Sequence, residues 1–97
     1  MTNKIKENEI IKLFHNAKTF DEMVIMIKTN SAKFANEGIM PDGDEILCCS
    51  EEKAEMVADF AESIMCDYVS TGYYDPIDDM RNNEVDFRTG LWYVCVD

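Results

Sequence analysis

The chain has 97 residues and a formal net charge of −11, with 46% apolar and 10% aromatic residues. This length sustains one domain with its own core, and the apolar content excludes an intrinsically disordered acidic chain. Fully apolar runs such as Met23–Ile27 are far shorter than the roughly 20 residues that cross a bilayer, and charges interrupt the amino terminus before a signal-peptide core develops. We therefore expect a single soluble, cytoplasmic domain over residues 1–97.

The charge is distributed unevenly along the chain. Residues 1–36 hold six lysines against four acids, a balance of +2, whereas residues 37–97 hold sixteen acids against three bases, a balance of −13. A negative field repels nucleic-acid phosphates and anionic lipid headgroups, so direct binding of nucleic acid or of a membrane is not expected. A partner with a basic surface, or solubility alone, is the interpretation that the charge favours.

The cysteines do not have the spacing of a metal site. They form no CxxC pair, and His15 is the single histidine, so the usual spacing of zinc ligands is missing. Each lies in an apolar segment, which predicts buried free thiols in a reducing compartment, with redox or metal chemistry and a disulfide as the alternatives. The four positions are Cys48, Cys49, Cys66 and Cys95.

The amino-terminal part, residues 1–38, is predicted to be helical. Apolar residues at helical spacing predict a first helix over about Asn3–Ala17. Thr19 followed by Glu22 has the form of a capping box, so a second helix begins near Phe20, and Gly38 is a residue that commonly ends one. The run MVIMI within this second helix is also short and apolar enough for a strand.

The central part is predicted to contain a turn, a strand and the longest clear helix. Pro41–Gly43 form the turn, and a buried strand follows over Glu45–Cys49. Ser50 then caps a helix over residues 51–67, whose apolar positions keep the 3-4 spacing and include three alanines, which allow close packing on a sheet. The opposite side of this helix carries an acidic stripe, which is ordinarily a solvated surface, formed by Glu52, Glu55, Asp59 and Glu62.

Two further strands complete the predicted fold. Residues 69–74 and 91–96 are rich in β-branched and aromatic residues, and the second segment is apolar on both faces, so it is predicted to be central. The first segment carries Ser70, Thr71 and Gly72, which suit an edge. The prediction is an α+β fold in which two helices precede a β-α-β-β part (residues 45–97), with a three-stranded mixed sheet and helices packed on one face.

An acidic loop over residues 75–90, here called the acidic insert, joins the last two strands and is far longer than an ordinary hairpin connection. Calcium binding fails the EF-hand register, because Ile77 and Met80 occupy the third position and the glycine position of a loop that starts at Asp75. Catalysis by paired carboxylates lacks an apolar pocket that would raise one pKa. We therefore predict no enzyme activity, no cofactor and no metal, and a metal-binding protein remains a less favoured alternative.

Recognition of a partner explains the insert better. Aromatic residues and Met80 surround its acids, which is the mixture that protein interfaces favour. The hypothesis is a monomer or weak homodimer that contacts a basic protein through helix 51–67 and the insert, and the alternative is a DNA mimic that inhibits a nucleic-acid-binding protein. The residues predicted to contact the partner are the acidic stripe (Glu52, Glu55, Asp59, Glu62) together with Tyr73, Tyr74, Asp75, Asp78, Asp79, Glu84 and Asp86.

The segments TGYYDPIDD (Thr71–Asp79) and TGLWYV (Thr89–Val94), which follow the helix SEEKAEMVADFAESI, resemble a family of small acidic proteins carried by conjugative transposons and related mobile elements of Gram-positive bacteria. The resemblance covers about residues 45–97. That family has no assigned catalytic residues, so the resemblance transfers no site. It implies a bacterial cytoplasm and an accessory, regulatory or inhibitory role for the element.

Overall fold

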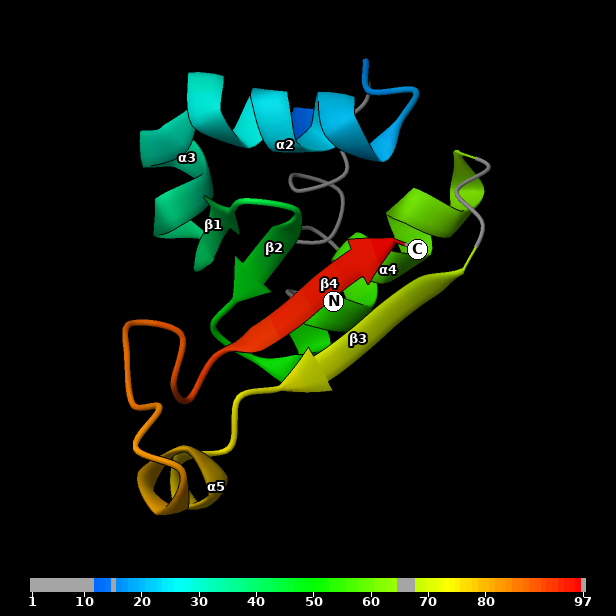
Figure 1. Ribbon diagram of the computed structural model, residues 1–97. Coiled ribbons are helices and arrows are strands. Elements are labelled where there is room, and N and C mark those ends of the chain that lie inside the picture. The colour runs from blue at the N-terminus through cyan, green and yellow to red at the C-terminus, as the bar shows by residue number, and fades with distance from the viewer. Residues whose placement is uncertain (1–11, 15, 65–67, 97) are drawn as a thin grey trace.

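The computed structural model describes residues 12–14, 16–64 and 68–96, and within them helices and a four-stranded sheet form an α+β fold (Figure 1). Residues 12–14 are helical, and the remainder of the predicted first helix before them lies outside the described residues. The named elements are α2 (Phe20–Thr29), α3 (Ser31–Asn36), β1 (Ile39–Asp42), β2 (Glu45–Cys48), α4 (Glu51–Ser63), β3 (Val69–Tyr73), α5 (Pro76–Arg81) and β4 (Trp92–Val96).

The second predicted helix is real but is divided in two. Thr19 caps α2, because its hydroxyl accepts a hydrogen bond from the Glu22 N–H at 3.1 Å. The Glu22 carboxylate accepts from the Lys18 N–H and not from that of Thr19, so the predicted reciprocal capping box is displaced by one residue. The helix stops at Asn30, whose side-chain amide donates to the Met26 carbonyl, and α3 begins directly after it.

The sheet has the order β1-β2-β4-β3, and every neighbouring pair is antiparallel. The predicted three-stranded mixed sheet is therefore wrong in the number of strands and in the kind of pairing. The predicted core of the topology is confirmed: β4 is central, β3 is an edge, and β2 lies on the far side of β4 and parallel to β3. The α4 crossover between β2 and β3 completes a split β-α-β unit.

The strand that the sequence did not reveal is β1. Pro41 and Asp42, predicted to form a turn, belong to this strand, and the turn consists of the two residues Gly43 and Asp44. Proline has no N–H for a ladder and is tolerated only at a sheet edge, which is where β1 lies. A proline in a short segment thus concealed a strand.

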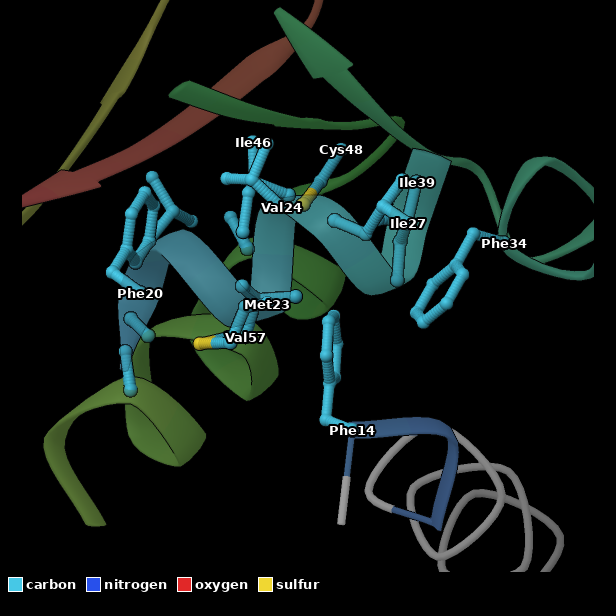
Figure 2. Packing of buried hydrophobic residues seen from close by; sticks show 14 of the residues in the cluster. Phe14, Phe20, Met23, Val24, Ile27, Phe34, Ile39, Ile46, Cys48 and Val57 are labelled. Atoms are coloured by element: carbon cyan, nitrogen blue, oxygen red, sulfur yellow. The ribbon is translucent and has the colours of Figure 1, made fainter. Parts of the chain in front are cut away.

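The core lies between the sheet and helices α2, α3 and α4, and Figure 2 shows its closely packed apolar side chains. Strand residues of one face, Ile39, Ile46 and Val94, are each no more than 1% exposed and pack with residues from all three helices. The α4 alanines are also buried, as their spacing predicted. Helix α5 is different, because none of its residues is buried and it lies beyond the end of the sheet (Figure 1). None of the helices in the described ranges has the length and apolar character that crossing a bilayer requires.

Candidate partner-binding surface

The acidic stripe on α4 is exposed along its whole length. Ser50 caps the helix by accepting a hydrogen bond from the Lys53 N–H at 3.2 Å. The helix ends at Ser63, earlier than the predicted residue 67, and residues 65–67 lie outside the described residues. No ion pair or hydrogen bond from the stripe side chains occurs among the described residues, so its carboxylates face solvent: Glu52, Glu55, Asp59 and Glu62.

The acidic insert, predicted as a loop, contains the short helix α5. Asp75 is the N-cap of α5, and its side chain accepts a hydrogen bond from the Ile77 N–H at 2.8 Å. Pro76 occupies the first helical turn, where a missing N–H costs nothing. The sequence DPIDD thus encodes a helix start, and the Asp75 carboxylate has a structural role.

Two further carboxylates of the insert are occupied by contacts within it. The Thr89 hydroxyl donates to Asp79 at 2.8 Å and accepts a hydrogen bond from the Asp86 N–H at 3.0 Å. Asp86 also receives the Arg88 guanidinium at 2.7 Å. Of the insert carboxylates predicted to meet a partner, Asp78 and Glu84 are exposed and make no side-chain hydrogen bond or ion pair among the described residues.

Arg88 fastens the insert to the rest of the molecule. Besides its ion pair with Asp86, the Arg88 guanidinium lies 3.6 Å from the Asp42 carboxylate and 5.4 Å from the centroid of the Tyr74 ring. Hydrogen bonding to Arg88 holds the pKa of Asp86 below its usual value, and the same pairing raises the pKa of Arg88. The pair therefore stays ionised at neutral pH and links the insert to the β1–β2 hairpin.

The two neighbouring tyrosines at the start of the insert point to opposite sides of the sheet, as alternate strand residues do. Tyr73 is 43% exposed and its ring lies 4.6 Å from that of Trp92. Tyr74 is half-buried on the helix-free side, 5.2 Å from the Tyr93 ring, and its hydroxyl donates to the Glu45 carboxylate at 2.5 Å. Tyr73 is thus available to a partner, whereas Tyr74 serves the fold.

The pKa of Tyr74 should make stability depend on alkaline pH. Burial, followed by the hydrogen bond to Glu45, raises the pKa of Tyr74 from 10.0 to about 12. A raised folded-state pKa gives stability that is complete below the unfolded value and is lost as pH rises through about 12. The free energy of unfolding of Tyr74→Phe, measured with urea, should therefore fall less between about pH 10 and 12 than that of the native chain. Parallel pH profiles for the two proteins would contradict this assignment.

The insert also exposes large apolar side chains. Ile77 and Met80, one helical turn apart on α5, are 62% and 68% exposed, and Val85 and Phe87 are 59% and 63% exposed. Met80 had been noted among the residues around the acids of the insert, but none of these four side chains was among the residues predicted to contact the partner. The sequence indicates them as large apolar residues within an otherwise polar segment, which has no second apolar segment beside it to bury them.

The cysteines only partly follow the prediction of burial. Cys48 is fully buried, and desolvation raises the pKa of its thiol to about 12, so it stays protonated. The neighbouring Cys49 is exposed, which corrects the prediction, and both are free thiols. Cys66 lies outside the described residues. Throughout the described ranges, no three His, Cys, Asp or Glu side chains are grouped so that they could hold a metal ion.

Comparison with known proteins gives no relative that would assign this surface. No protein-family model, no curated protein and no solved structure matches the chain.

Proposed function

We propose that the protein is a non-enzymatic binding module that contacts a basic protein partner through the acidic insert and the exposed side of α4. The observation that carries this proposal is the exposure of four large apolar side chains within the insert, Ile77, Met80, Val85 and Phe87. Such groups concentrated on one short segment are typical of interaction sites, because a monomer gains nothing by presenting them to water.

The surroundings of these side chains indicate the charge of the partner. Asp78 and Glu84 lie in the same segment and have no intramolecular side-chain partner among the described residues. Apolar anchors with a charged rim are a common composition for an interface, and a rim of carboxylates favours lysine and arginine on the other side. The apolar groups favour a protein interface over imitation of a phosphate backbone, which has no counterpart for Met80 or Phe87.

The cellular setting remains a proposal from the resemblance of residues 45–97 to proteins of bacterial mobile elements. In that setting the module acts in the cytoplasm as an accessory regulator or inhibitor, with no reaction of its own.

A matched pair of variants tests this function. Met80→Ser combined with Phe87→Ser removes two anchors of the insert, and Ile25→Ser removes an apolar side chain that is 59% exposed on α2. The protein should recover a basic partner from cells that carry it, the α2 variant should recover the same partner, and the insert variant should not. About 0.5 M salt should release the partner, because exposed charges are screened at that ionic strength. Recovery of the same partner by the insert variant would overturn the proposal.

A further inference from the structure

Strand β3 forms an open edge of the sheet. It pairs with β4 on one side, and in the described part of the chain no strand lies on its other side. Figure 1 shows β3, in yellow, bordering the sheet on the side away from α2 and α3. Such an edge presents backbone donors and acceptors that an added strand can use.

The register indicates which residues present these groups. The Tyr74 N–H donates to the Leu91 carbonyl, and the Tyr74 carbonyl accepts from the Gly90 N–H, so Tyr74 faces β4. Backbone groups alternate in direction along an antiparallel strand, so those of Val69, Thr71 and Tyr73 point outward. None of these three residues makes a backbone hydrogen bond outside the β3–β4 pair among the described residues.

The two edges of the sheet differ in their protection. The opposite edge, β1, carries Pro41 and Asp42, a missing donor and a charge, which discourage strand pairing. In contrast, β3 has the sequence VSTGY, with no charge and no proline. Thr71 and Tyr73, whose backbone groups point outward from this edge, are also exposed. Of the two edges, β3 is therefore the one suited to accept another strand.

The side of α4 next to this edge is acidic. Lys53 lies 3.6 Å from Glu37, and the Phe60 ring stacks 5.5 Å from that of Phe14, so this flank of α4 faces the α3 side of the molecule. Helical spacing puts a second set of residues on the opposite flank, towards β3, against which α4 packs. This set, here called the α4 flank, consists of the exposed residues Glu51, Glu55 and Glu62.

We propose that the β3 edge binds an extended lysine- or arginine-rich segment of a protein partner, which adds to the sheet as a fifth strand. This inference rests on the proposed function and gives it a binding mode. Alternate side chains of a strand lie on one face about 6.6 Å apart, close to the roughly 6 Å that a helix rises over the four residues from Glu51 to Glu55. Basic residues at two alternate positions therefore meet this pair on the α4 flank while the backbone pairs with Val69, Thr71 and Tyr73.

Two peptides of equal charge separate strand addition from simple attraction. The first alternates lysine and valine over about nine residues, enough to span β3, and the second has the same sequence with its central amides N-methylated, which removes the donors. Amide hydrogen exchange by NMR locates the binding site, and calorimetry gives the affinity. The first peptide should slow exchange at Val69, Thr71 and Tyr73 by about tenfold or more, whereas the second should bind at least about tenfold more weakly and protect none of them.

Variants of the protein provide an independent check. Thr71→Pro removes one outward N–H and should weaken binding of the first peptide about tenfold, while Thr71→Val keeps that N–H and should not. Glu55→Lys on the α4 flank should weaken binding, whereas Asp44→Lys, a reversal in the β1–β2 turn, should have a smaller effect.

Equal binding of both peptides, protection at β1 instead of β3, or no binding of the first peptide would each overturn strand addition. These results leave the insert contact standing, because that contact is judged separately by loss of the partner from the Met80→Ser and Phe87→Ser variant.

Discussion

Replacing Phe34 with alanine is expected to lower the free energy of unfolding by about 3–5 kcal/mol, the usual cost of emptying a buried aromatic site. Phe34 is fully buried on α3, and its ring centroid lies 4.8 Å from that of Phe14. Phe14 in turn stacks on Phe60 of α4 at 5.5 Å, so the cavity would open where three segments of the chain meet. A typical domain is stable by only about 5–15 kcal/mol, and the loss is a large part of that.

The acidic insert supplies a control of the same chemistry. Phe87 is 63% exposed, so Phe87→Ala should change the free energy of unfolding by less than about 0.5 kcal/mol. Urea unfolding of both variants measures the difference. Equal destabilisation by the two substitutions would show that Phe87 has a packed position and would remove it from the partner-binding surface.

Replacing Gly38 with alanine is expected to have the second large effect, about 2–4 kcal/mol, from left-handed backbone strain together with crowding. Gly38 has a φ of +74°, and a Cβ there would lie 2.2 Å from Cys49 Sγ and 2.9 Å from its Cβ. The Gly38 carbonyl also accepts a hydrogen bond from the Cys49 N–H at 2.9 Å, so the two segments cannot separate without breaking the start of the β1–β2 ladder.

Gly43 isolates the contribution of crowding. It also has a positive φ, +56°, but a Cβ built there meets nothing within 4 Å. Gly43→Ala should therefore cost only the backbone strain, about 1 kcal/mol. Thermal or urea unfolding that ranks the Gly43 variant as the less stable of the two would contradict the packing described around Cys49.

The parts of the fold that local pattern determines were predictable from the sequence. β4 was predicted to be central because both of its faces are apolar, and it lies between β2 and β3. The spacing of α4 predicted its buried alanines and its exposed acids together. β1 was missed because Pro41 contradicts the pattern of a strand, and its place depends on the pairing partner that β2 supplies. The break at Asn30 likewise depends on a side-chain contact that no periodicity records.

The candidate surface was likewise predictable only where local pattern determines it. The acidic stripe needed only helical spacing, so the sequence sufficed to predict its exposure. Within the acidic insert, by contrast, composition treated all carboxylates alike, although Asp75, Asp79 and Asp86 are used by an N-cap, by Thr89 and by Arg88. Which acids remain for a partner depends on hydrogen bonds between residues up to ten positions apart, and composition carries no information about them.

The hydrogen bonds at the base of the acidic insert affect how the sequence of this protein can change in evolution. Hydrogen bonds from the Tyr74 N–H to the Leu91 carbonyl and from the Gly90 N–H to the Tyr74 carbonyl join the two ends of the insert. Doubling the length of a closed loop costs only about 0.6 kcal/mol of chain entropy. We therefore expect segments of other lengths and sequences to be tolerated between these two ends with little effect on the sheet, so that new binding specificities can arise there.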